Sequence, residues 1–265
     1  MKIFLWKTIL GFSFCFTQCL YASSIEANSY ILYNNSTHNI VHAHKEHKQV
    51  PIASLTKIMS AYLVFEKLDL GIISFKNQVE IGHEEIAIQP LGASTSLELG
   101  QAVSVKTLLE AMLIASANDA AVALAKYTSQ SESRFVFLMN RTAKYLGMTN
   151  THFTHPHGIY SDNHYSTAHD LLLLIKSFYK RFPHHYRVFS LLSTNINGEK
   201  KRNRNELLGA LSPFDGLKTG YTKKAGYCLA FSGLKLNQRF FGLVLGAKSS
   251  TKRFQVAKML LTMME

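Results

Sequence analysis

The chain has 265 residues, of which 47% are hydrophobic and 17% are charged, a globular composition that excludes a disordered chain. Five Pro and 15 Gly exclude a collagen-like or low-complexity chain, and the single long apolar run excludes a multispanning membrane protein. The 29 Lys and Arg outnumber the 17 Asp and Glu, and the net charge of +12 favours attraction to anionic surfaces.

The first 22 residues have the order of a secretory signal peptide. A basic start with Lys2 and Lys7 precedes an apolar stretch at residues 9–16, and small residues follow from Ala22. Because a membrane-spanning helix needs about 20 apolar residues, we expect cleavage near Ala22, with an uncleaved anchor as the alternative. The mature chain, residues 23–265, would be secreted across the inner membrane to the periplasm or cell wall zone. Its net charge would be +10 after Lys2 and Lys7 are lost from the +12.

Cysteine usage is consistent with export without disulfide bonds. Cys15 and Cys19 would leave with the signal peptide, so Cys228 would stand alone in the mature chain. The apolar, strand-like run at residues 227–231 predicts that Cys228 is a buried and inert thiol.

Hydrophobic periodicity predicts strands near both termini of the mature chain and helices between them. Residues 54–68, for example, carry apolar side chains at helical spacing, and Ser104 is a candidate N-cap of the next helix. We predict strands at 28–34, 39–44, 226–233 and 239–246, and helices at 54–68, 104–114, 118–127, 131–146, 167–181 and 251–264.

The order of these elements predicts an α+β fold. Strands from the two ends of the chain would form an antiparallel sheet flanked by helices, and the middle would form a mainly helical lobe. No repeat or linker marks a boundary within residues 23–265. A pocket between the sheet and the lobe is the expected place for an active site.

A serine and a lysine three residues apart open the helix predicted at 54–68. Ser54 and Lys57 would share one helix face, so the amine can reach the hydroxyl. A serine becomes a good nucleophile when a neighbour takes its proton, and a lysine can do so if desolvation or another cation lowers its pKa. A lone Ser-x-x-Lys is frequent by chance and does not establish a site.

Two further polar motifs follow. Ser116 and Asn118 lie at the break between two predicted helices and offer a proton relay and a carbonyl-binding amide, although such residues also cap helices. Lys218, Thr219 and Gly220 supply a charge, a hydroxyl and a close approach to the backbone, although a lysine can also protect a strand edge. Together, the three motifs in this order are typical of penicillin-binding proteins and serine β-lactamases.

On these residues the chain resembles the low-molecular-mass penicillin-binding proteins, that is, the D-alanyl-D-alanine carboxypeptidases and their endopeptidase relatives. The resemblance covers nearly all of the mature chain and implies a β-lactamase/transpeptidase-like fold for residues 23–265. The strings that carry it are Pro51-Ile52-Ala53-Ser54-Leu55-Thr56-Lys57-Ile58-Met59, Ser116-Ala117-Asn118-Asp119, Leu146-Gly147-Met148, Pro156-His157-Gly158, Tyr165-Ser166-Thr167-Ala168-His169-Asp170, Asn203-Arg204-Asn205 and Asp215-Gly216-Leu217-Lys218-Thr219-Gly220-Tyr221-Thr222.

The resemblance implies a serine peptidase that removes the terminal D-alanine from peptidoglycan stem peptides through an acyl-enzyme. Ser54 would be the nucleophile, Lys57 the general base and Ser116 the proton relay to the leaving amine. Backbone N–H groups of Ser54 and Tyr221 would form the oxyanion hole. The implied substrate-binding residues are Asn118, Arg204, Lys218, Thr219, Gly220 and Tyr221. No metal or cofactor is implied, and β-lactam antibiotics would be covalent inhibitors.

Two departures from the family pattern bear on specificity. Some relatives carry His after Lys-Thr-Gly, and Tyr221 here would remove any role of an imidazole in deacylation. Many relatives also add a C-terminal β domain, which we do not expect here because the sequence ends at Glu265. The shorter form and residues 226–229 favour an endopeptidase that cuts cross-links. The strings at 215–217 and 117–119 favour a carboxypeptidase, which we expect.

Three other functions remain as alternatives. A class A β-lactamase would need a Glu to activate water, and the comparable stretch at 149–157 has no acid. A non-catalytic wall-binding protein would not need the three intact motifs. A metal site could use the histidines near 38–47 or 152–157, but no zinc motif accompanies them, so the first group more simply covers a strand edge and His157 is structural.

The charge distribution bears on the remaining partners. The densest basic cluster, at residues 200–204, lacks the interleaved aromatic residues of a single-strand binder, so we expect no nucleic-acid partner. Peripheral association with anionic wall or membrane surfaces is the functional interpretation of the basic charge, and a solvated basic surface is the simpler one.

Overall fold

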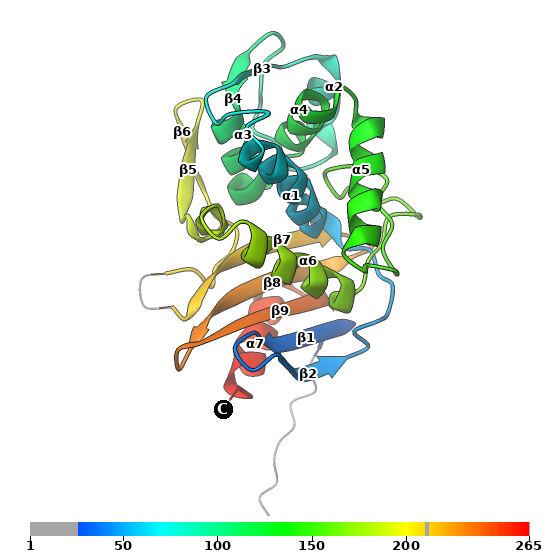
Figure 1. Cartoon of the computed structure of the whole chain (residues 1–265), viewed down its shortest axis with the longest axis vertical. Coiled ribbons are helices and arrows are strands. Elements are labelled where there is room, and N and C mark those ends of the chain that lie inside the picture. The colour runs from blue at the N-terminus through cyan, green and yellow to red at the C-terminus, as the bar shows by residue number, and fades with distance from the viewer. Residues whose placement is uncertain (1–25, 210–211, 265) are drawn as a thin grey trace, which may run out of the picture.

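The computed structural model describes residues 26–209 and 212–264 (Figure 1). The predicted signal peptide, residues 1–22, lies outside these ranges. No helix within them combines the length and the apolar character that a membrane crossing requires.

A five-stranded antiparallel sheet, in the order β2-β1-β9-β8-β7, forms one half of the molecule (Figure 1). Its strands come from both ends of the chain, as predicted, because the first apolar strand pairs with the last. The four predicted strands are confirmed, and a fifth carries the Lys-Thr-Gly motif along one edge. The strands are β1 (Ser29–Asn34), β2 (Asn39–His44), β7 (Phe214–Thr222), β8 (Gly226–Lys235) and β9 (Gln238–Ala247).

Helices cover both faces of this sheet. Helix α6 (Ala168–Arg181) packs on one face and helix α7 (Ser250–Thr262) on the other (Figure 1). Side chains alternate between the faces along a strand, so Leu243 joins the core on the α6 side and Val244 joins the core on the α7 side. This two-sided burial explains why β8 and β9 are apolar along most of their length.

The middle of the chain forms the predicted helical lobe, drawn above the sheet in Figure 1. Its helices share one large apolar core with the α6 face of the sheet. The lobe contains α1 (Thr56–Asp69), α2 (His83–Ala87), α3 (Val105–Glu110), α4 (Asn118–Ser129) and α5 (Glu132–Tyr145). It also contains two short ribbons, β3 (Gln78–Glu80) with β4 (Ala102–Ser104) and β5 (Ser193–Ile196) with β6 (Glu199–Arg202). Short turns complete it: η1 (Ala53–Leu55), η2 (Gln89–Leu91), the π-helical η3 (Ala111–Ala115) and η4 (Tyr186–Ser190).

Side-chain caps mark the starts of several helices, α3 among them. The hydroxyl of Ser104 accepts the backbone N–H of Thr107 at the start of α3, which confirms the predicted cap. The helix predicted at 104–114 ends earlier, at Glu110, and continues as the π-helical turn η3. The same type of cap opens α5, α6 and α7, and the capping residues are Ser131, Thr167 and Ser249.

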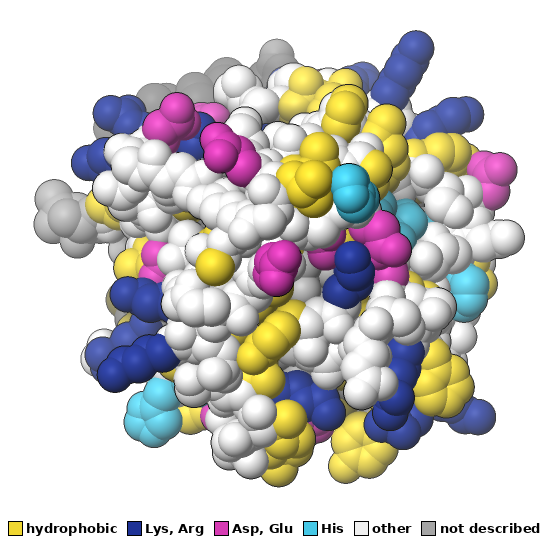
Figure 2. Space-filling view, turned by 90° about the horizontal axis from the view of Figure 1, so that it is seen from above, with side chains coloured by type: hydrophobic (Ala, Val, Ile, Leu, Met, Phe, Trp, Pro, Cys, Tyr) yellow, Lys and Arg dark blue, Asp and Glu magenta, His cyan; other side chains and the backbone are white. Residues whose placement is uncertain are grey.

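Charged side chains are spread over the surface. Figure 2 views the molecule from the end of the helical lobe, and most lysine and arginine side chains on this face lie near its margin. Acidic and hydrophobic side chains lie between them, so the basic side chains do not form one continuous patch on this face.

Candidate active site

Ser54 lies in a tight turn that leads into helix α1. Ala53, just before it, has a left-handed backbone with φ of 48°, which is uncommon for a residue with a side chain. The turn continues directly into α1, so Lys57 lies one helical turn after Ser54. Gly158 closes against this turn. Its φ is +90°, and a Cβ atom there would lie 2.1 Å from the carbonyl oxygen of Ala53, so only glycine fits.

Lys57 is fully buried and its amine is surrounded by oxygen atoms. Its Nζ lies 3.1 Å from Ser54 Oγ, 2.7 Å from Asn118 Oδ1 and 2.6 Å from the carbonyl oxygen of His157. Burial, together with the positive charge of Arg204, lowers the pKa of Lys57 to about 7, although the negative charge of Asp119 opposes this shift. The amine is therefore close to half neutral at physiological pH.

Ser116 and Asn118 are brought beside this pair by the break between η3 and α4. Ser116 ends the π-helical turn in a left-handed conformation with φ of 65°, and Asn118 begins α4. The Asn118 backbone N–H donates to the carbonyl of Ala93 at 2.7 Å, and Gly92 lies so close to the amide that a Cβ atom would be 2.8 Å from Nδ2. The break therefore presents a hydroxyl and an amide side by side.

Asp119 supports the loop that lies over this break. The carboxylate is completely buried and accepts the backbone N–H of Thr95 at 3.0 Å and the amide of Gln89 at 3.3 Å. The loop that it holds brings Leu91, Gly92 and Ala93 to the pocket described below. These residues could not be predicted from the sequence, because the loop has no periodic pattern.

Strand β7 lies directly against the Ser54 turn. A Cβ atom on Gly220 would lie 3.1 Å from the Ser54 backbone nitrogen, from the Ala53 Cβ and from the carbonyl oxygen of Ile52. The close approach expected at Gly220 is therefore present, and the strand that approaches is an edge strand of the sheet. Tyr221 follows and is 53% exposed.

Lys218 is buried behind this edge, and no acidic side chain among residues 26–209 and 212–264 forms an ion pair with it. Its Nζ donates to the carbonyl oxygen of Thr219 at 3.0 Å. Burial holds the pKa of Lys218 well below its usual value, and the positive charges of Lys57, Arg204 and Arg253 add to this effect. The site thus concentrates basic side chains around a single cleft.

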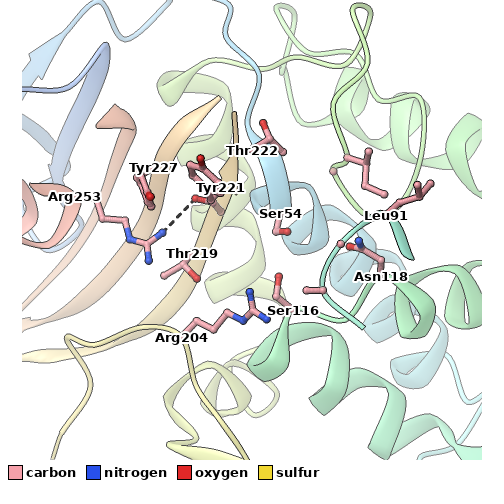
Figure 3. Close-up of a pocket in the computed structure, with 15 residues that line it drawn as sticks. Ser54, Leu91, Ser116, Asn118, Arg204, Thr219, Tyr221, Thr222, Tyr227 and Arg253 are labelled. Atoms are coloured by element: carbon pink, nitrogen blue, oxygen red, sulfur yellow. Dashed lines mark hydrogen bonds between the residues drawn. The ribbon is translucent and has the colours of Figure 1, made fainter. Parts of the chain in front are cut away.

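These residues surround a pocket of about 410 Å³ between the sheet and the helical lobe (Figure 3). Figure 3 shows Ser54, Ser116 and Asn118 facing one another on the helical side, with Thr219 and Arg204 across from them. Lys57 and Lys218 lie buried behind the wall. The wall consists of Ser54, Leu91, Gly92, Ala93, Ser116, Asn118, Gly158, Ile159, Arg204, Thr219, Gly220, Tyr221, Thr222, Tyr227 and Arg253.

Arg253 is a further residue of the site, one that was not predicted from the motifs. It projects from α7, is only 6% exposed, and donates to the carbonyl oxygens of Gly220 at 3.3 Å and Cys228 at 3.5 Å. Its guanidinium also lies 5.6 Å from the ring centre of Tyr227. A signal was present, because residue 253 shares the helix face of the apolar residues 256, 257 and 260. A basic residue on that face indicates a buried cation.

The remaining cysteine and histidines lie outside this wall. Cys228 is buried in β8, as predicted, and burial raises the pKa of its thiol to about 11. His42 and His44 on β2 lie against Tyr30, and the centre of each imidazole ring is 5.5 Å from the centre of the Tyr30 ring. In the part of the chain that the structure describes, no three His, Cys, Asp or Glu side chains converge to hold a metal ion.

Comparison with known proteins relates this chain to a peptidase family. The family described as D-alanyl-D-alanine carboxypeptidase matches residues 17–249. The carboxypeptidase DacF of Bacillus subtilis (strain 168) is 37% identical over 244 residues, which are 89% of this chain and 61% of that protein. The carboxypeptidase DacC of Escherichia coli (strain K12) is 35% identical over 255 residues, which are 94% of this chain and 64% of that protein. This chain thus spans less than two thirds of either relative.

Solved structures confirm the expected fold class. Penicillin binding protein 5 from Haemophilus influenzae superposes with a TM-score of 0.87 at 34% identity, covering 90% of this chain and 70% of that chain. Penicillin-binding protein D2 from Listeria monocytogenes, solved in a cefotaxime-bound form, gives a TM-score of 0.82 at 31% identity. That match covers 90% of this chain and 97% of the Listeria chain.

Proposed function

This chain belongs to the D-alanyl-D-alanine carboxypeptidase family, and we propose that it is a serine carboxypeptidase that removes the terminal D-alanine from peptidoglycan stem peptides through an acyl-enzyme. The observation that carries this proposal is the arrangement of oxygen atoms around the buried amine of Lys57.

That arrangement suits a neutral amine that acts as a general base. A neutral amine has two N–H groups and one lone pair. The two shortest contacts, to the Asn118 Oδ1 and the His157 carbonyl, take the two N–H groups because both oxygens only accept. The lone pair then faces the Ser54 hydroxyl 3.1 Å away, which can donate its proton to it. A pKa near 7 keeps enough of the neutral form for this role.

In the acylation step, Ser54 Oγ attacks the carbonyl carbon between the two D-alanines while Lys57 takes the hydroxyl proton. The negative charge that develops on the carbonyl oxygen would be held by the backbone N–H groups of Ser54 and Tyr221. The close contact of Gly220 with the Ser54 nitrogen supports this pairing, because it brings β7 beside the turn.

Departure of D-alanine requires a proton on its nitrogen and a binding site for its carboxylate. Ser116 would pass the proton from Lys57 to the amine as the C–N bond breaks, and Asn118 would hold the peptide. Thr219 and Arg204 would bind the carboxylate. We propose that Arg253, which lines the same pocket wall, also binds it. Water then hydrolyses the ester and regenerates Ser54.

β-Lactams would acylate the same serine, in keeping with the cefotaxime-bound Listeria neighbour. We also propose that residues 1–22 are a signal peptide and that residues 23–265 form a peptidase domain working in the periplasm or cell wall zone. The basic charge would favour peripheral contact with anionic wall or membrane surfaces.

Incubation with two peptidoglycan substrates tests the proposal. Purified protein and a Ser54→Ala variant are mixed with pentapeptide monomers and with cross-linked dimers, and mass spectrometry follows the products. We expect monomers to lose one D-alanine with the wild type alone. Conversion of dimers to monomers instead would establish an endopeptidase, and no reaction of either substrate would overturn the enzymatic assignment of Ser54.

A further inference from the structure

Three histidine rings form a stack behind the Ser54–Lys57 pair, and the reaction steps above use none of these rings. His155 lies in the middle, with its ring centre 4.2 Å from that of His157 and 4.1 Å from that of His164. The rings are nearly parallel, with interplanar angles of 8° and 9°. His157 and His164 are buried, and His155 and His157 belong to the loop that carries Gly158.

One end of the stack reaches the nucleophile turn through Thr56. The backbone N–H of Thr154 donates to His164 Nδ1 at 3.0 Å, so a neutral His164 carries its proton on Nε2. That N–H donates to Thr56 Oγ1 at 2.8 Å, and the Thr56 hydroxyl in turn donates to the carbonyl oxygen of Ala53 at 2.8 Å. The direction of each hydrogen bond in this series is fixed, because a backbone N–H begins the series and a backbone carbonyl ends it.

This series of hydrogen bonds ends at Ala53, the strained residue of the turn. Ala53 adopts a φ of 48°, a conformation that persists only where its surroundings hold it. Its carbonyl belongs to the peptide group whose N–H is that of Ser54. The hydrogen bond from Thr56 therefore fixes the direction of the Ser54 N–H, which the proposed function places in the oxyanion hole.

The other end of the stack holds the general base. The carbonyl oxygen of His157 accepts from Lys57 Nζ at 2.6 Å. Its ring Nδ1 accepts the backbone N–H of Ile159 at 3.2 Å, and His155 Nδ1 accepts that of Gly158 at 3.1 Å. These bonds fold the loop so that the His157 carbonyl faces Lys57.

We propose that the His157–His155–His164 stack positions the nucleophile and its base, and that His164 is a positioning residue that acts on Ser54 through Thr56. The inference rests on the proposed function, because it assumes that Ser54 is acylated. Burial supports it by keeping the rings neutral, since it lowers the pKa of His155 to about 4 and those of the other two further.

Acylation by a fluorescent penicillin, followed by stopped flow, tests the proposal. The measurement separates the non-covalent Kd from the acylation rate constant, and the variants are Thr56→Val, Thr56→Ser, His164→Phe and the double variant Thr56→Val/His164→Phe. We expect Thr56→Val and His164→Phe to lower the rate constant by roughly ten- to a hundredfold with Kd changed less than about twofold. Thr56→Ser should retain the wild-type rate constant, because it keeps the hydroxyl.

The double variant separates positioning from general destabilisation. If His164 acts through Thr56, the double variant should be no slower than the slower single variant, whereas independent effects would multiply. Val244→Ala, in the core on the α7 side, is the control for lost stability, with Tm measured for every variant. Wild-type rate constants in both single variants, losses no larger than that of Val244→Ala, or multiplying effects would overturn the proposal. A wild-type protein that fails to react would overturn the proposed function itself, and this inference with it.

Discussion

The α-carbon of Gly220 faces the backbone nitrogen of Ser54 so closely that a Cβ atom on Gly220 would lie 3.1 Å from it. The two residues are far apart in the sequence, and their contact joins the sheet to the helical lobe at the reacting centre. We therefore expect Gly220→Ala to push β7 away from the turn and to lower acylation by about 10- to 100-fold. Gly209→Ala is the matched control, since no atom of the residues that the structure describes lies within 4 Å of a Cβ atom there. Equal acylation rates for the two variants would contradict this expectation.

The pH dependence of acylation should follow Lys57. Because burial lowers its pKa to about 7, the neutral amine becomes the main form as pH rises through that value. We expect the acylation rate constant to rise between about pH 6 and 8 with a midpoint near 7 and then to level off. A flat profile across this range, with the protein folded throughout, would show that another group takes the Ser54 proton.

Arg204 should contribute to the position of that midpoint. Its positive charge helps to lower the pKa of Lys57, so Arg204→Gln should raise the pKa and move the midpoint to higher pH. The same variant should raise KM for a pentapeptide by roughly tenfold, because a charge-assisted bond to the carboxylate is lost. Arg202→Gln, an exposed change on β6, is the control and should leave both quantities near wild type.

Arg253 should be needed for substrates that carry a free carboxylate. It is nearly buried and its Nη1 donates to the Gly220 carbonyl, so the guanidinium is held in place before substrate arrives. We expect Arg253→Gln to raise KM for a pentapeptide by about 10- to 100-fold. A pentapeptide amidated at its C-terminus should be a poor substrate for the wild type, and the variant should lose little further activity on it. Equal losses on both peptides would indicate that Arg253 has only a structural role.

The three stacked histidines should make the fold sensitive to acid. In the folded protein burial lowers the pKa of His155 to about 4, whereas a histidine in the unfolded chain has a pKa of about 6.5. Below pH 6.5 the unfolded chain therefore binds more protons than the folded protein does. The free energy of unfolding keeps its full value above pH 6.5 and decreases as pH falls toward 4. Lys57 adds little in this interval, because the midpoint of its own titration in the folded protein lies near pH 7 and the amine is mostly protonated below it.

Urea unfolding between pH 6.5 and 5 measures this effect. Each buried histidine should contribute a slope of up to about 1.4 kcal/mol per pH unit. His155→Gln should reduce the total slope by about that amount toward pH 5. An unchanged slope would mean that His155 takes up its proton without unfolding.

Much of the fold could be predicted because its elements have strong periodic patterns. Strands β1, β8 and β9 and helices α1, α5 and α6 carry runs of apolar residues that need burial, and their observed bounds lie within one or two residues of those predicted in nearly every case. The short ribbons β3–β4 and β5–β6 were missed, because strands of three or four residues with exposed positions have no detectable period.

The site was predictable only where a motif marks the chemistry. The three motifs are far apart in the sequence, and the fold brings them to one pocket. Arg253, Asp119 and the stacked histidines were not assigned site roles, since their parts depend on burial and on partners distant in sequence. Similarly, the left-handed conformation of Ala53 is imposed by Gly158 and Thr56, and nothing in the sequence around Ala53 indicates it.

Mass spectrometry of the protein after reaction with a penicillin tests the central claim most directly. Intact mass gives the number of adducts, and peptide mapping gives the residue that carries the adduct. We expect one penicilloyl group on Ser54 of the wild type and none on Ser54→Ala, with Lys57→Ala reacting at least about a hundredfold more slowly. An adduct on another residue, or equal labelling of wild type and Ser54→Ala, would contradict the assignment of Ser54 as the nucleophile activated by Lys57.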